Sequence, residues 1–291
     1  SHPNLQGGFA PIHMEVDAPD LVVEGEIPDQ LRGVFFRNGP NPQFSPRGDY
    51  HWFGGDGMIH GFYFAEGKVS YRNRYVKTIK WKKEKEEGRS LFSAFNPMDS
   101  DESVMGMETD GLANTNIVYH AGKLLALEEA HAPFELDPLS LESIGSYDFG
   151  GKFSGPMTAH PKIDPENGEM LFFGYNVGGL FSDEMAFHVV DSDGKLVRSE
   201  SFKAPYSSMV HYFMVTREHV IFPIMPLTGS LDRAMSGGPA YAWEPEKGVH
   251  IGLFLSFSKN STTSLTKSLV LKFESKFFKF SVKFSFLNIS L

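Results

Sequence analysis

The sequence predicts an all-β protein, and two kinds of observation support this. Short apolar runs with period-2 alternation recur at roughly 8–12 residue intervals, as strands of small sheets do, and Asn-Gly or Asp-Gly turns separate many of them. Segments with the 3.6-residue period of a helix are nearly absent. The pattern is typical of a β-sandwich, a barrel or a propeller, and the consecutive hairpins favour a propeller, although no strict repeat motif is present.

The clearest hairpin is predicted for residues 50–78. An aromatic pair and the turn sequence Gly54-Gly-Asp-Gly precede a strand, which turns at Ala65-Glu-Gly and returns as a second strand. The glycines suit a backbone that needs positive φ or a close approach to another part of the chain. This stretch therefore predicts a β-hairpin beside a functional opening.

Further segments repeat the strand, turn, strand rhythm, with Asp, Asn, Gly or Pro at the turns. The charged segment 77–90 precedes them and is predicted to be a solvated surface loop or a short helix. The strand–turn–strand segments are 112–129, 134–147, 157–176, 185–202 and 207–226.

Composition limits the class of protein. The chain has 291 residues, a net charge of −9 and no cysteine. An acidic surface argues against a nucleic-acid partner, because binding phosphates requires basic side chains. The lack of cysteine excludes disulfides, thiolate metal sites and cysteine nucleophiles, and it fits a reducing compartment.

No targeting segment is visible. The sequence lacks an apolar run of about 18 residues that would predict a transmembrane helix, and its first residues lack a basic region followed by an apolar core. These observations predict a cytoplasmic location. The sequence does not begin with Met, so organellar targeting stays open as an alternative.

Residues 253–291 differ from the preceding chain. They hold nine Ser, eight Phe and six Lys, with no Gly, Pro, Ala, Asp, His or Tyr. One interpretation is a genuine Phe-rich β or amphipathic segment, and the other is sequence that does not belong to the fold. We favour the second and divide the chain into a domain at 1–252 and an atypical tail at 253–291.

Without cysteine, a metal site must use histidines and carboxylates. The eleven histidines form neither HExxH nor HxH. His160 and His211 are the strongest candidates, because each ends a small apolar run that predicts a strand, and a neutral imidazole at the strand end would point into a cavity. Imidazole ligands suit Fe, Zn or Cu and do not choose among them.

Glu128 and Glu129 are predicted to lie on one strand and therefore to face opposite sides. A buried glutamate needs a partner, so we expect the inward one to accept a hydrogen bond from a histidine ring and to orient it. Two surface glutamates are the alternative. A phosphate-binding glycine loop and the GxSxG motif of hydrolases are both absent.

Six segments, in this order and over residues of about 7–252, closely resemble the carotenoid cleavage dioxygenase family, which includes the lignostilbene dioxygenases. The segments are FRNGPNPQF, YHWFGGDGMIHG, YRNRYVKT, ANTNIVYHAGKLLALEEA, TAHPKIDPENGEM and WEPEKGVHIG. The resemblance implies a seven-bladed β-propeller with a non-haem Fe(II) on its axis, held by four histidines. It also implies cleavage of a conjugated double bond of a carotenoid, apocarotenoid or stilbene by O2, which gives two carbonyl products.

The resemblance assigns His160 and His211 as the first two iron ligands and Glu129 as a carboxylate that orients a ligand ring. It implies Fe(II) as cofactor and an apolar polyene and O2 as substrates. Peripheral membrane contact would fit lipid-soluble substrates, and no nucleic acid is expected.

The sequence also departs from the family pattern. Tyr212 stands where Asp usually follows the second ligand, and Glu128 stands where an aromatic residue is common. Family members are about twice as long, and no histidine follows His250. We therefore expect an incomplete propeller, with about the first half of the blades. The alternatives are a truncated, non-catalytic protein that binds a polyene, a stilbene-cleaving enzyme, and a complete propeller without iron.

Overall fold

The computed structural model describes residues 2–48, 50–94, 97–255 and 269–273. The chain folds as two compact units. Unit 1 comprises Ser1–Ala159 with Ser192–Lys195, and unit 2 comprises His160–Asp191 with Leu196–Leu291.

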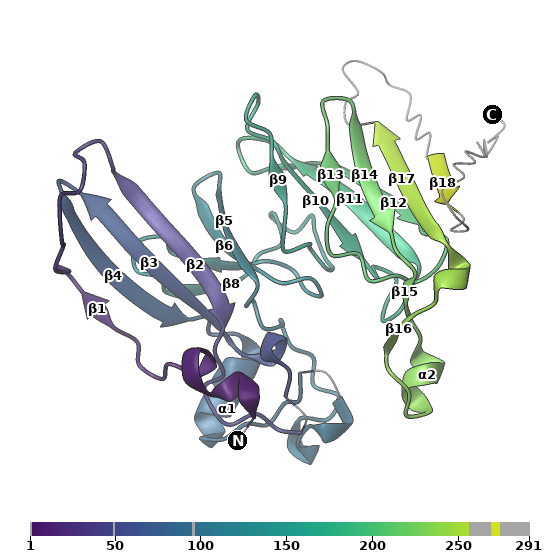
Figure 1. Cartoon of the computed structure of the whole chain (residues 1–291), viewed down its shortest axis with the longest axis horizontal. Coiled ribbons are helices and arrows are strands. Elements are labelled where there is room, and N and C mark those ends of the chain that lie inside the picture. The colour runs from purple at the N-terminus through teal and green to yellow at the C-terminus, as the bar shows by residue number, and fades with distance from the viewer. Residues whose placement is uncertain (1, 49, 95–96, 256–268, 274–291) are drawn as a thin grey trace. The chain divides into compact units, whose positions relative to one another are not determined.

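Unit 1 contains two four-stranded antiparallel sheets among its described residues (Figure 1). The first has the order β1-β4-β3-β2 and consists of β1 (Asp17–Ala18), β2 (Gly33–Pro40), β3 (Gly57–Ala65) and β4 (Lys68–Tyr75). The second has the order β5-β6-β7-β8 and consists of β5 (Asn116–His120), β6 (Lys123–Leu127), β7 (Phe134–Leu136) and β8 (Ser143–Ser146).

The hairpin predicted for residues 50–78 is confirmed by the pairing of β3 with β4. Its turn is formed by Glu66 and Gly67, both at positive φ. Gly57 serves close approach rather than positive φ, because a Cβ there would lie 2.3 Å from the carbonyl oxygen of Ala113. A larger residue at position 57 would therefore separate β3 from the chain that leads into β5.

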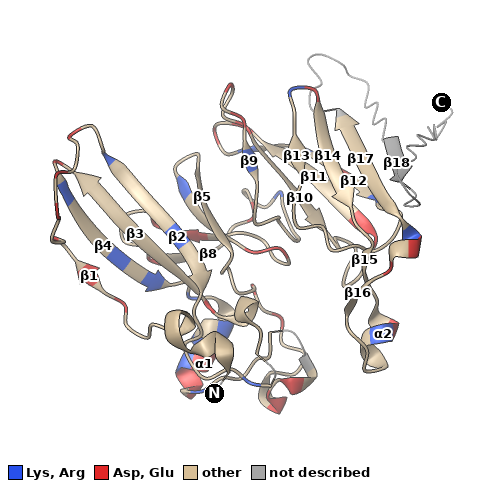
Figure 2. Cartoon of the chain, in the orientation of Figure 1, with Lys and Arg blue, Asp and Glu red and all other residues tan. Residues whose placement is uncertain are grey.

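The charged segment 77–90 forms helix α1 (Ile79–Glu87), with Thr78 as the N-cap and Gly88 in the left-handed conformation after the last turn. The helix carries charges of both signs (Figure 2). The expectation that this segment is solvated is wrong for Lys80 and Glu84, which are both buried.

Lys80 is the centre of a buried ionic cluster in unit 1. Its Nζ donates to Asp56 Oδ1 at 2.7 Å and to Glu84 Oε2 at 2.8 Å. The other oxygen of Glu84 accepts from the backbone N–H groups of Leu91 and Phe92 at 2.9 and 3.0 Å. Burial opposes the charge on Lys80, but the two carboxylates outweigh it and raise the pKa of the lysine.

Unit 2 contains two further four-stranded antiparallel sheets and a two-stranded one among its described residues. The first, with the order β12-β11-β10-β9, consists of β9 (Lys162–Ile163), β10 (Met170–Tyr175), β11 (Glu184–Val190) and β12 (Leu196–Lys203). The second, with the order β13-β14-β17-β18, consists of β13 (Met214–Val215), β14 (His219–Ile224), β17 (Val249–Leu255) and β18 (Leu269–Phe273). The pair β15 (Leu227–Gly229) and β16 (Tyr241–Trp243) flanks helix α2 (Leu231–Met235).

These elements confirm that the described chain is mostly β-structure, and sheets of four antiparallel strands are typical of propeller blades. The remaining helices are short 3₁₀ turns at Pro3–Leu5, Gly7–Phe9, Trp52–Gly54, Pro97–Asp99, Glu102–Val104 and Pro245–Lys247. Each helix in the described residues is too short or too polar to cross a lipid bilayer.

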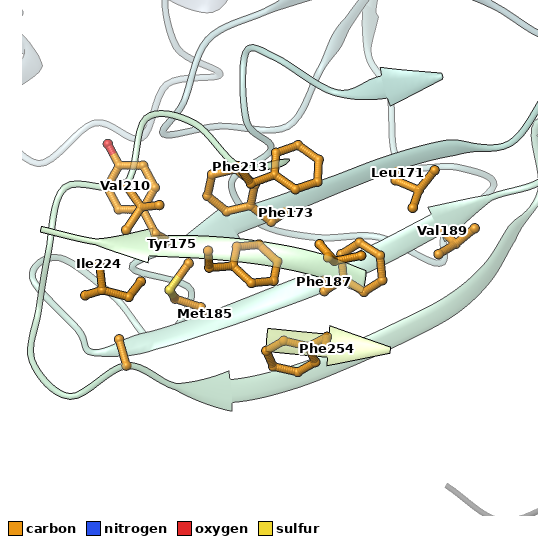
Figure 3. Close-up of a cluster of buried hydrophobic side chains, with 13 residues drawn as sticks. Leu171, Phe173, Tyr175, Met185, Phe187, Val189, Val210, Phe213, Ile224 and Phe254 are labelled. Carbon is orange, nitrogen blue, oxygen red and sulfur yellow. The ribbon is translucent and has the colours of Figure 1, made fainter. Parts of the chain in front are cut away.

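Each unit has its own apolar core. In unit 1, side chains from β3, β6 and β7 pack together, including Ile59, Leu124 and Phe134. In unit 2, aromatic side chains of β10, β11, β14 and β17 pack together, among them Phe173, Phe187 and Phe254, as Figure 3 shows. In β14 every second residue is buried, as strand alternation predicts, whereas every residue of β10 is buried.

The predicted tail lies largely outside the described residues, which omit 256–268 and 274–291. Strand β17 runs across the expected boundary at 252/253 and pairs with β18. The division into 1–252 and 253–291 stays a prediction.

Candidate metal centre

His160 and His211 both belong to unit 2 and lie outside regular strands. His160 precedes β9 and His211 precedes β13. The expectation that each histidine ends a strand is therefore wrong. In the segment before His160, the N–H of Met157 donates to the carbonyl of His131 at 3.0 Å, a loop contact rather than a sheet ladder.

The two imidazole rings lie next to each other, although 51 residues separate them in the sequence. Their Nε2 atoms are 3.1 Å apart, and the ring planes are inclined by 71°. Two imidazole nitrogens at about 2.1 Å from one ion, at right angles, are about 3.0 Å apart. The pair therefore has the spacing of two ligands of a single metal ion.

The electrostatics around His160 favour a neutral ring. Burial lowers the pKa of His160, and His211 and Lys162 lower it further. A metal ligand must be a neutral imidazole, so a lowered pKa reduces competition from protons at neutral pH. Two imidazole nitrogens fit Fe, Zn or Cu and do not by themselves select one of these metals.

Tyr212 and Lys162 form the surroundings of the pair. The Tyr212 ring lies 5.8 Å from the ring of His160, and Lys162 Nζ lies 3.6 Å from the centre of the Tyr212 ring. This is a cation–π contact. Sequence reasoning noted Tyr212 as a departure but missed Lys162, because its partner lies 50 residues further along the chain.

Glu129, the third predicted site residue, belongs to unit 1 and is half-buried in a bend after β6. Strand β6 ends at Leu127, so the expectation that Glu128 and Glu129 share a strand is wrong. The role of Glu129 as an orienting carboxylate stays a prediction.

Glu128, the neighbour of Glu129, contacts a histidine ring. It is buried, accepts from the N–H of Leu112 at 2.8 Å, and pairs with Nδ1 of His131. Burial alone would lower the pKa of His131, but the hydrogen bond and charge of Glu128 outweigh it and raise the pKa. Sequence reasoning missed His131. The feature that could have identified it as a partner of Glu128 is its position three residues later in the sequence.

His188 has an ordinary structural role. It is buried on β11, stacks on Phe172 and hydrogen bonds through Nδ1 with Ser199 Oγ at 2.5 Å. Burial lowers its pKa to about 4.

Across the described parts of both units, no group of three or more His, Cys, Asp or Glu side chains is placed to hold a metal ion.

Comparison with known proteins decides the family. The family described as RPE65, retinal pigment epithelial membrane protein, matches residues 9–280 of the sequence. The chain belongs to this family. The resemblance to carotenoid oxygenases inferred from the motifs is therefore confirmed, and the match continues past Gly252, where the motifs ended.

Curated relatives in this family have varied names. The chain is 43% identical to isoeugenol monooxygenase of Pseudomonas nitroreducens over 86% of its own length and 53% of the relative. It is 41% identical to lignostilbene-alpha,beta-dioxygenase isozyme III of Sphingomonas paucimobilis, with 86% and 51% covered. For carotenoid cleavage oxygenase 1 of Neurospora crassa the identity is 39%, with 86% and 48% covered. The chain thus spans about half the length of the curated relatives it matches.

Solved structures of the family have a similar fold. Lignostilbene dioxygenase of Pseudomonas brassicacearum matches with a TM-score of 0.83 and 37% identity, covering 88% of this chain and 54% of the other. The cobalt-substituted apocarotenoid oxygenase of Synechocystis matches with a TM-score of 0.75 and 28% identity, covering 90% of this chain and 57% of the other.

Proposed function

We propose that this chain is part of a non-haem Fe(II) dioxygenase that cleaves a conjugated carbon–carbon double bond with O2. The observation that carries the proposal is the 3.1 Å spacing between the Nε2 atoms of His160 and His211. These are the two positions that the resemblance assigns as iron ligands.

The fold proposed for the complete protein is a seven-bladed β-propeller, of which this chain supplies the first blades. The support is the succession of four-stranded antiparallel sheets in both units and the likeness to solved carotenoid oxygenases. The domain of this chain would then be 1–252, followed by the atypical segment 253–291.

His160 and His211 would hold the iron through Nε2, and bound iron would supply the site at which O2 is activated. Both rings must be neutral to bind, and the lowered pKa of His160 keeps its ring neutral. Tyr212, which Lys162 contacts, lies with its ring 5.8 Å from the ring of His160. Glu129 is proposed, from the resemblance, to orient a ligand ring.

The reaction proposed for the complete protein breaks one C=C bond and places one oxygen atom of O2 on each carbon, giving two carbonyl products. Carotenoids or apocarotenoids are the substrate class expected from the sequence. A stilbene or phenylpropene is the second candidate, because the isoeugenol and lignostilbene enzymes share higher identity with this chain than the carotenoid oxygenase does.

Anaerobic equilibrium dialysis of the 291-residue chain against Fe(II) tests the site. We expect His160→Ala and His211→Ala each to weaken iron binding by at least about 10-fold, because each removes one of two ligands. The matched control is His219→Ala, a change in the same unit at the start of β14.

Equal iron binding by the wild type and both ligand variants would contradict the assignment. Oxygen uptake with an apocarotenoid and with a hydroxystilbene then tests the reaction class. Binding of either compound without carbonyl products would favour the alternative, in which this chain binds an apolar alkene but does not cleave it.

A further inference from the structure

The three residues before His160 form a segment that no sheet holds. Met157, Thr158 and Ala159 are all buried and lie outside regular strands. A buried backbone carbonyl needs a hydrogen-bond donor, and without a ladder this donor must come from a side chain, another loop or water. The hydrogen bonds of Met157–Ala159 therefore identify the groups that hold the backbone before His160.

The carbonyl of Ala159 accepts a hydrogen bond from the side chain of Asn116. The Asn116 Nδ2 to Ala159 O distance is 2.6 Å, and both residues belong to unit 1. The peptide plane that contains this carbonyl also contains the backbone nitrogen of His160, because the peptide bond is planar. The bond from Asn116 therefore fixes the orientation of the peptide group from which His160 begins.

Asn116 is itself held firmly. Its main chain pairs with Leu127 in the β5–β6 ladder, and its carbonyl accepts from Nδ2 of Asn38 at 2.8 Å. Asn38 Nδ2 also donates to the carbonyl of Ala113 at 2.8 Å, which ties β2 to the start of β5. The donor that reaches Ala159 thus projects from a strand with little freedom to move.

We propose that Asn116 is a positioning residue for His160: its side-chain amide fixes the Ala159–His160 peptide group and so sets the direction in which the imidazole projects. This inference rests on the proposed function only in its consequence for metal binding. An amide N–H suits the task because it donates at every pH and adds no charge near a cation.

A second contact holds the other end of the segment. The N–H of Met157 donates to the carbonyl of His131, whose ring pairs with the buried carboxylate of Glu128. The segment is therefore anchored at its first and last residues, and the Asn116 bond is the anchor nearer to the imidazole.

The test compares Asn116→Leu with Asn114→Leu in the full chain. Leucine has nearly the size of asparagine and cannot donate. Asn114 is a matched control because its Nδ2 also donates to backbone carbonyls of unit 1, those of Phe53 and Gly55, both at 2.7 Å. Asn116→Ala is a second variant in case the leucine is not accommodated, and thermal unfolding checks that every variant is folded.

Two readouts separate positioning from stability. With Co(II) as the metal probe, we expect Asn116→Leu to weaken binding roughly 10-fold and to alter the visible absorption bands, which report coordination geometry. Asn114→Leu should change neither, even with a similar loss of thermal stability. Without metal, ¹⁵N relaxation should show a lower order parameter for the His160 amide in Asn116→Leu and an unchanged one in Asn114→Leu.

An unchanged Co(II) affinity, spectrum and His160 order parameter in folded Asn116→Leu would overturn the inference. If the wild type and His160→Ala bind Co(II) alike, the proposed metal centre is wrong. The relaxation comparison then decides by itself whether Asn116 orders His160.

Discussion

The buried cluster around Lys80 and the pair of His160 and His211 are both polar groups in close contact, yet they differ in what they can do. In the cluster, Lys80 donates hydrogen bonds to Asp56 and Glu84. Glu84 in turn accepts hydrogen bonds from two backbone N–H groups. The charge of Lys80 is paired with those of the two carboxylates. Because Lys80 and Glu84 lie on α1 and Asp56 does not, these contacts hold α1 in place.

The histidine pair is built differently. Two nitrogens of the same kind face each other at 3.1 Å, and neutral rings can share only one proton between them. A cation between the rings would use both lone pairs. The comparison teaches that a polar cluster is a candidate site when its groups converge on one point, rather than when they are simply buried and charged.

The largest effect is expected at the cluster. Lys80→Met leaves Asp56 and Glu84 buried without a cation, and should cost about 3–5 kcal/mol in the free energy of unfolding. Urea unfolding measures it. The control is Lys83→Met on the same helix, whose bridges to Glu86 and Glu87 are more exposed and contribute about 0.5 kcal/mol or less. Similar losses for both variants would show that the cluster is not a structural anchor.

A second prediction concerns His188, a buried histidine whose hydrogen bond lies within the fold. Its pKa falls from 6.5 to about 4 in the folded chain, so the unfolded chain binds more protons between these values. The stabilisation is complete above pH 6.5 and is lost as the pH falls towards 4, by about 3 kcal/mol in total.

His188→Phe should remove this part of the pH dependence, because phenylalanine does not titrate. Urea unfolding at several pH values between 4 and 7 measures the difference between variant and wild type. Parallel pH curves for the two proteins would mean that His188 titrates normally and is not held neutral by burial.

The smallest effect is expected at Lys162. Its charge is the weakest of the three causes that lower the pKa of His160, after burial and His211. Lys162→Met should therefore raise the pKa of His160 slightly towards its ordinary value, as followed by NMR titration of the ring. Lys203→Met, an exposed lysine in the same unit, is the control. A downward shift in Lys162→Met would contradict the account of the electrostatics.

The sequence predicted the parts of the fold that depend on neighbouring residues. Turn chemistry located the β3–β4 hairpin at Glu66-Gly67, because such turns depend on a few adjacent positions. It did not predict the burial of Lys80, since the partner Asp56 lies 24 residues away, in the loop before β3.

The assignment of His160 and His211 as metal ligands comes from the family resemblance and stays a prediction, and the structure adds that their Nε2 atoms lie 3.1 Å apart. The error at Glu128 and Glu129 came from extending β6 past Leu127, a matter of boundaries that local patterns define poorly. The contact of Asn116 with Ala159 joins residues 43 positions apart, and no local signal marks it.

X-ray absorption at the zinc edge of the Zn(II)-loaded chain tests the central claim most directly, because it counts imidazole ligands around the ion. We expect two imidazole nitrogens at about 2.0–2.1 Å, and one in His160→Ala. A zinc shell without imidazole, or one that is the same in His160→Ala, would contradict the claim that His160 and His211 bind one metal ion together.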